Sequence, residues 1–93
     1  MEKNNIDIHT KLSSLPNIGK ILEAQLLEIN IKDYGDLKRT GAKQAWLDIQ
    51  SIDPSACMHK LLALEGAIRG LKKQMLPIEI KEDLHQFFNT YKK

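Results

Sequence analysis

The residues of this 93-residue chain that are best suited to hold a ligand lie in the segment 15–20, LPNIGK. A proline followed by Asn17 and Gly19 is typical of a tight turn, because glycine takes positive φ freely and asparagine is the next most tolerant type. Backbone N–H groups at the start of the following helix can converge on one anion, aided by the helix dipole, and Lys20 adds a positive charge. We therefore regard Asn17, Ile18, Gly19 and Lys20 as a candidate phosphate-binding turn and, through it, a candidate nucleic-acid site.

The same turn also has an architectural interpretation. Asn17 can adopt αL geometry and accept a local backbone hydrogen bond, and its side chain can occupy the donors that a phosphate would use. Ile18 then plugs the space between the flanking helices. A second basic cluster, formed by Arg69 with residues 72–73, is either a nucleic-acid patch or a set of ordinary solvated cations at a helix end.

Metal and thiol chemistry are poorly supported. Cys57 and His59 could bind a metal with His9 or His85, but no CxxC or HxxxH pair fixes two ligands on one face. Cys57 falls on the apolar stripe of a predicted helix, which indicates an inert core thiol rather than a nucleophile. We expect no metal, no cofactor and no enzymatic activity.

The elements that must position these residues are all helical, since apolar residues recur at steps of three and four and no strand pattern occurs. We predict an all-α bundle of five or six short helices in one domain spanning residues 1–93. The predicted helices cover about residues 8–15, 20–29, 33–40, 42–50, 56–70 and 77–91. Asn30 is placed for an αL residue after the second helix, Asp33 for the N-cap of the third, and Gly41 for its end.

The helix predicted over residues 56–70 has two faces. One carries the larger apolar residues, and the other carries small residues, among them Gly66 and Gly70. Because a glycine inside a helix costs up to about 1 kcal/mol relative to alanine, we expect another helix to cross closely there. Glu65 either pairs with Arg69 at i+4 or is a buried carboxylate bonded to another helix end.

Aromatic residues occur late in the chain. Trp46 and the rings of Phe87, Phe88 and Tyr91 fit a core, because small domains need such area. If the last helix instead exposes one of these rings, it becomes a docking surface.

Composition limits the classes of function. Fourteen basic and twelve acidic residues give a formal charge of +2, well short of a protein dominated by phosphate contacts. No apolar segment is long enough for export or membrane spanning, and Cys57 has no partner for an internal disulfide. We expect a cytoplasmic protein that does not bind membranes.

Three motifs point to a known family. The segment 15–26, followed by Asn30 and Ile31, resembles the helix-hairpin-helix pattern. Together with residues 37–42, LKRTGA, and residues 61–70, LLALEGAIRG, it resembles the C-terminal domain of the TfoX family over about residues 13–88. The third motif contributes Leu64, Glu65, Gly66, Ala67, Arg69 and Gly70.

That resemblance implies a helix-hairpin-helix-like bundle with a regulatory role, because TfoX proteins regulate bacterial competence genes, and it implies no catalytic residue or cofactor. Full members carry a separate N-terminal domain for which 93 residues leave no room. DNA-gripping hairpins also usually have glycine where this chain has Asn17. These departures and the low charge favour an adaptor that binds another protein. The alternative is weak, non-sequence-specific nucleic-acid binding through Asn17–Lys20, and an enzyme would need a cleft of coupled titratable groups.

Overall fold

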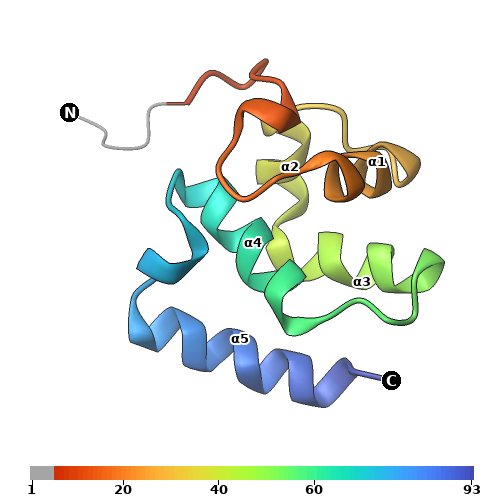
Figure 1. Cartoon of the computed structure of the whole chain (residues 1–93), viewed down its shortest axis with the longest axis vertical. Helices are drawn as coiled ribbons and strands as arrows, with labels where there is room; N and C mark the ends of the chain where they lie inside the picture. Colours follow the sequence, from red (N-terminus) through yellow and green to blue (C-terminus); the bar gives the residue numbers. More distant parts are fainter. Residues whose placement is uncertain (1–5) are drawn as a thin grey trace.

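The computed structural model describes residues 6–93, and its elements are helical, as the sequence predicts. The helices are α1 (Lys20–Glu28), α2 (Tyr34–Thr40), α3 (Ala42–Ile52), α4 (Met58–Arg69) and α5 (Ile78–Tyr91), with short 3-10 turns η1 (Leu12–Ser14) and η2 (Lys73–Met75). Helix α4 is central and packs against α2, α3 and α5 (Figure 1). In the described part of the chain, β-type pairing is limited to a single bridge between Lys11 and Asp33.

The core is organised around Trp46 on α3, which is fully buried. Its indole Nε1–H donates to the carbonyl of Cys57 at 3.1 Å, so the polar atom of the ring is satisfied inside the core. The rings of Phe87 and Phe88 on α5 meet the indole edge-on, with centroids 6.2 and 5.6 Å away. The prediction that Trp46 is a core residue is confirmed.

The helix predicted over residues 8–15 is wrong, because only the 3-10 turn η1 forms there. The carbonyls of Ile8 and Thr10 instead accept from Gly35 N–H at 2.8 Å and Tyr34 N–H at 3.0 Å. These N–H groups belong to the first turn of α2, where helical partners are lacking. Ile8 and His9 form a turn, closed by Thr10 N–H donating to Asp7 O at 2.9 Å, and the backbone of this segment caps another helix.

The other helix ends follow the local signals in the sequence. Asp33 caps α2 by accepting from Asp36 N–H at 3.0 Å, and Gly41 separates α2 from α3 with φ 85°. Asn30 takes φ 67° after α1, and Ile31 folds back so that its N–H donates to Leu26 O at 2.9 Å. These predicted boundaries are confirmed.

Helix α4 differs from the prediction at its start. Cys57 is the exposed N-cap of α4 and is not buried on the apolar stripe, because the helix begins at Met58. The bond from Trp46 holds the Cys57 carbonyl, and not its thiol, toward the core. Gly70 ends the helix in the αL conformation with φ 73°. Leu71 N–H then donates to Gly66 O at 2.8 Å, and Gly70 N–H donates to Ala67 O at 3.3 Å. This is the bonding of a Schellman motif, so Gly70 is a helix terminator and not a crossing point.

Helix α5 follows Pro77, as predicted, and closes one side of the bundle (Figure 1). Leu84 is buried, whereas Phe87 and Phe88 are only partly buried and Tyr91 is 47% exposed. The predicted apolar face therefore leaves the core toward its C-terminal end. None of the helices in residues 6–93 is long and apolar enough to cross a membrane.

Candidate functional site

The hairpin turn reverses the chain between η1 and α1, and Asn17 is its left-handed corner with φ 71°. The αL prediction for Asn17 is confirmed. Gly19 instead has extended backbone, with φ −94° and ψ −172°, and is the exposed N-cap of α1. Positive φ is therefore needed at Asn17 and not at Gly19. Ile18 is buried and plugs the turn, while Lys20 at the first helical position is exposed.

The Asn17 side chain does not bond locally, which corrects the sequence-based expectation. Its Nδ2 donates to Leu71 O at 2.9 Å and to Ala63 O at 3.3 Å, and its Oδ1 accepts from Lys73 N–H at 3.0 Å. These partners lie 46 to 56 residues along the chain. Within the described residues, no side chain caps the first turn of α1, so Asn17 leaves those donors free.

Gly66 provides the space for that side chain. A Cβ added at Gly66 would lie 2.5 Å from Asn17 Nδ2 and 2.6 Å from Leu71 O. The expected close approach is real, but a turn and the chain after α4 make it, not a crossing helix. The two sequence motifs, residues 17–20 and residues 64–70, are therefore parts of one contact.

Basic residues come close to the hairpin through the same contact. Because the backbone of Lys73 bonds to Asn17, the Lys72 and Lys73 segment lies beside the turn, which their sequence separation does not reveal. Arg69 is held by Glu65, with Nε 2.6 Å from Oε2, so the predicted i, i+4 pair is confirmed. The other interpretation of Glu65, a buried carboxylate bonded to another helix end, is not observed.

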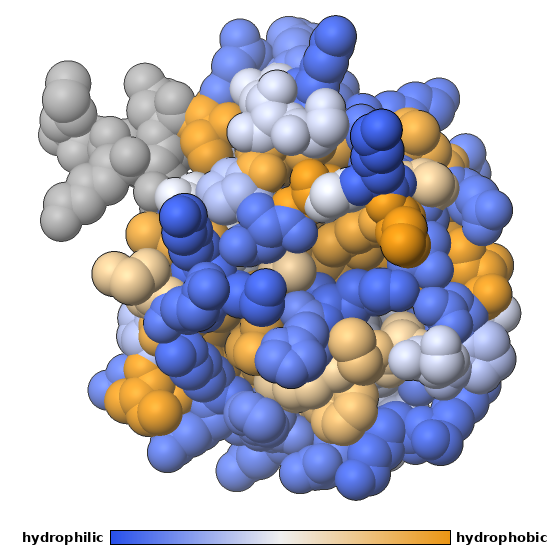
Figure 2. All heavy atoms as spheres, viewed as in Figure 1, coloured by the Kyte–Doolittle hydropathy of each residue, from blue (hydrophilic) through white to orange (hydrophobic). Residues whose placement is uncertain are grey.

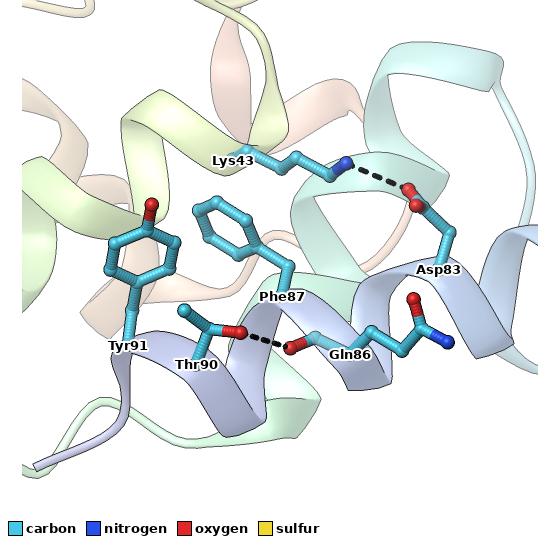
Figure 3. A pocket seen from close by; sticks show the side chains of 6 residues that line it. All are labelled: Lys43, Asp83, Gln86, Phe87, Thr90 and Tyr91. Carbon is cyan, nitrogen blue, oxygen red and sulfur yellow. Dashed lines mark hydrogen bonds and ion pairs between the residues drawn. The ribbon is translucent and has the colours of Figure 1, made fainter.

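A second candidate site is an open groove of about 280 Å³ between α3 and α5 (Figure 3). Lys43 Nζ lies 2.7 Å from Asp83 Oδ2 at one end and 5.4 Å from the centre of the Phe87 ring. The Phe87 and Tyr91 rings stand side by side, with centroids 4.7 Å apart. The sequence singled out both rings but not Lys43 or Asp83, since they are 40 residues apart and only packing joins them.

The end of α5 is anchored next to this groove. Gln50 on α3 is buried, and its Nε2 donates to the carbonyl of Tyr91 at 2.8 Å. The backbone at Tyr91 is therefore fixed to α3 while its ring stays accessible. The groove thus has a defined shape rather than being a frayed helix end.

Other exposed apolar side chains are scattered. The most exposed are Ile21 on α1 at 75%, Met75 on η2 at 68% and Ile78 on α5 at 62%. Figure 2 shows a mostly hydrophilic face on which hydrophobic residues surface in several separate places. Scattered apolar residues are normal, so none of these alone marks a site.

The densest group of bonded polar side chains joins α1 to the loop before α4. Asp53 Oδ2 accepts from Gln25 Nε2 at 3.0 Å and from Lys60 Nζ at 3.1 Å, and Oδ1 accepts from Ser55 Oγ at 2.6 Å. The bonds from Ser55, Gln25 and Lys60 hold the pKa of Asp53 well below its usual value. All parts are mutually satisfied, which is the pattern of a structural tie. Residues 6–93 contain no cluster of three or more His, Cys, Asp or Glu side chains that could hold a metal ion.

Comparisons with known proteins agree with this arrangement. Residues 8–88 match the TfoX C-terminal domain model. Protein Sxy of Escherichia coli (strain K12) is 35% identical over 89 residues, which are 96% of this chain but 43% of that protein. The chain therefore spans less than half the length of this curated relative.

Two crystal structures from Listeria monocytogenes have the same fold. An uncharacterized protein in a triclinic form is 43% identical with a TM-score of 0.86, covering 87% of this chain and 92% of that one. A protein of unknown function in a tetragonal form is 44% identical with a TM-score of 0.83, covering 85% of this chain and 98% of that one. With the family match over residues 8–88, these findings establish that the chain belongs to the TfoX C-terminal domain family.

Proposed function

We propose that this chain is a non-enzymatic regulatory module that binds another protein through the groove between α3 and α5. The family membership supports the regulatory part, since TfoX proteins regulate bacterial competence genes. The curated relative is more than twice as long as the matched region, so its whole activity is not transferred. What is proposed here is the binding step in such regulation.

The observation that carries this proposal is the exposure of the last ring of α5. Tyr91 is 47% exposed, although a domain of this size needs its aromatic area in the core. Tyrosine is enriched at the centres of protein interfaces, because it offers a large apolar surface and a polar tip. The neighbouring Phe87 ring and the Lys43–Asp83 pair give the groove an apolar floor and a polar rim.

Site-specific photo-crosslinking in the bacterium that encodes the chain tests this proposal. A photoreactive phenylalanine analogue replaces Tyr91 or Gln86 in the groove, and Glu28, exposed on α1, is the control. We expect one adduct of the same mass from both groove positions and none from Glu28. Tyr91→Ala should also reduce competence-gene expression, whereas Glu28→Ala should not. Equal adducts from all three positions, or no adduct from the groove, would contradict the proposal.

A second candidate function is weak, non-sequence-specific binding of nucleic acid by the hairpin. The specific observation in its favour is that the Asn17 side chain bonds away from the turn and leaves the uncapped first turn of α1 free. Lys20 at this turn and the adjacent Lys72 and Lys73 supply positive charge. Donors at a helix start with cations beside them suit a phosphate and read no sequence.

Titration of duplex DNA at several salt concentrations tests the second candidate. Binding should have a Kd on the order of 10⁻⁴ to 10⁻⁶ M and weaken steeply between about 50 and 200 mM salt. Lys20→Glu should weaken it for every sequence tried. Lys32→Glu makes the same charge change beyond the other end of α1 and should weaken it less. Equal effects of the two variants would indicate general charge attraction rather than a hairpin site.

A further inference from the structure

We propose that Asn17 is a latch that joins the hairpin turn to the connection between α4 and α5, so that these two distant segments change conformation together. The latch is the set of three hydrogen bonds between the Asn17 amide and the backbone: Nδ2 donates to the carbonyls of Ala63 and Leu71, and Oδ1 accepts from Lys73 N–H. The inference concerns the coupling of two surfaces and holds whatever either surface binds. It therefore goes beyond the proposed function and does not rest on it.

The latch is specific because one amide satisfies backbone groups of both polarities. Its Nδ2 reaches the carbonyls of Ala63 and Leu71, and its Oδ1 receives the N–H of Lys73. An amide carries a donor nitrogen and an acceptor oxygen on the same carbon. An ionised carboxylate only accepts, and a hydroxyl has one oxygen that cannot reach all three partners. The side chain therefore bonds only to backbone groups of α4 and of the residues that follow it.

The contact has little room to adjust. On one side, the Asn17 backbone is fixed in the αL region at the corner of the turn. On the other, Gly66 leaves only the space that the amide fills, with Nδ2 2.5 Å from where a Cβ would be. Close packing with no free volume transmits a displacement rather than absorbing it. A displacement of the hairpin should therefore also displace the C-terminal end of α4.

The C-terminal cap of α4 belongs to the same unit. Leu71 N–H closes the helix by donating to Gly66 O at 2.8 Å, while Leu71 O accepts from Asn17 at 2.9 Å. One peptide segment therefore ends α4 and receives the latch. Release of Asn17 removes a partner from the residue that terminates the helix.

The latch leads directly into α5. Lys73 is the first residue of η2, whose turn is closed by Met75 N–H donating to Lys72 O at 2.8 Å. Leu76 is buried immediately afterwards, and α5 begins at Ile78. A molecule that moves either the hairpin or this connection must alter the other, and such coupling is reciprocal by thermodynamic linkage.

Amide hydrogen exchange measured by NMR on the whole chain tests the latch. Two reporters flank it: Glu23 N–H, which donates to Gly19 O at 2.9 Å after the hairpin, and Met75 N–H in η2. Ala45 N–H, which donates to Gly41 O at 3.0 Å in the first turn of α3, reports local opening of a helix end outside the latch. For each variant, the change in exchange rate at Glu23 and Met75 is divided by the change in exchange rate at Ala45.

The key variant is Asn17→Gly, which keeps the αL corner and removes the amide. We expect exchange at both Glu23 and Met75 to rise about thirtyfold relative to Ala45, the change that follows when two hydrogen bonds with a net contribution of about 1 kcal/mol each are lost. Asn30→Gly is the matched control, because Asn30 is the other left-handed asparagine and is exposed beyond α1. It should leave the ratio at Met75 unchanged.

Gly66→Ala approaches the latch from α4 and should raise exchange at Glu23, although Glu23 lies on another helix. In the double variant with Asn17→Gly, the increases should be smaller than the product of the two single effects, because the clash of the alanine methyl with Asn17 Nδ2 is then removed and only the clash with Leu71 O remains. The proposal is overturned if Asn17→Gly changes Glu23 but not Met75. It is also overturned if Ala45 rises as much as the reporters, or if the two substitutions multiply.

Discussion

Removing the Asn17 amide should measurably destabilise the fold even though the turn itself is kept. In Asn17→Gly, the left-handed corner at φ 71° is retained at no steric cost. What is lost is the 2.9 Å bond to Leu71 O, the 3.0 Å bond from Lys73 N–H and the longer bond to Ala63 O. Two well-formed bonds at a partly buried site, each contributing about 0.5 to 1.5 kcal/mol net, give a loss of about 2 kcal/mol.

The added freedom of glycine in the unfolded chain contributes about another 0.5 to 1 kcal/mol. For a domain of this size, a total of about 2 to 3 kcal/mol lowers Tm by roughly 10 to 20 °C. Thermal unfolding followed by circular dichroism at 222 nm measures this directly. The control Asn30→Gly carries the same unfolded-state term without the long-range bonds, so its loss should stay below about 1 kcal/mol.

The difference between the two glycine variants isolates the three bonds, because both positions are left-handed asparagines near an end of α1. If Asn17→Gly and Asn30→Gly melt within a degree or two of each other, the amide of Asn17 contributes nothing and the argument for the latch is refuted. Urea unfolding at fixed temperature provides a second measure, and an unchanged slope would show that the denatured state is unaffected.

Four other outcomes are expected. Tyr34→Phe removes the buried bond from the Tyr34 hydroxyl to Ile68 O at 2.8 Å and should lower the unfolding free energy by about 1 to 2 kcal/mol in urea titration. Asp53→Asn should lower the unfolding free energy at pH 7. Because folding lowers the pKa of Asp53, the carboxylate stabilises the fold above pH 3.8 and this stabilisation is lost as the pH falls below that value. The melting temperatures of the two proteins should therefore converge in acid. The Cys57 thiol should react completely with Ellman's reagent in the folded protein, since it is exposed, whereas a core thiol would need denaturant. Gly19→Ala should change the melting temperature by no more than a few degrees, because its φ is ordinary and no atom lies within 4 Å of the added Cβ.

Local signals in the sequence were sufficient for the helices and most of their ends. Asp33 caps α2 through a residue three positions away, and Gly41 and Asn30 take the positive φ expected of a stop. Such features involve atoms a few residues apart, so their geometry follows from residue type and spacing. The apolar face of α3 and the Glu65–Arg69 pair were predictable for the same reason.

Tertiary contacts override the local pattern at residues 8–15 and at Cys57. Residues 8–11 have a pattern compatible with a helix, but the carbonyls of Ile8 and Thr10 accept from N–H groups of α2, and no helix forms there. Cys57 fits the apolar stripe of a helix that starts at residue 56, but α4 begins two residues later, at Met58, so Cys57 precedes the helix and is exposed. Both outcomes depend on a neighbour that sequence spacing does not identify.

The sequence by itself determined an all-helical fold, a hairpin with Asn17 at its corner and membership of the TfoX C-terminal domain family. Only the tertiary structure decided which groups Asn17 bonds to, and that a side chain at position 66 would clash with Asn17 and Leu71. The physical reason is that backbone conformation and helix capping are set within a few residues, whereas a side-chain amide meets its partners only after segments more than 45 residues apart have packed. The groove of Lys43, Asp83 and Tyr91 is a product of the same packing, since neither α3 nor α5 contains it alone.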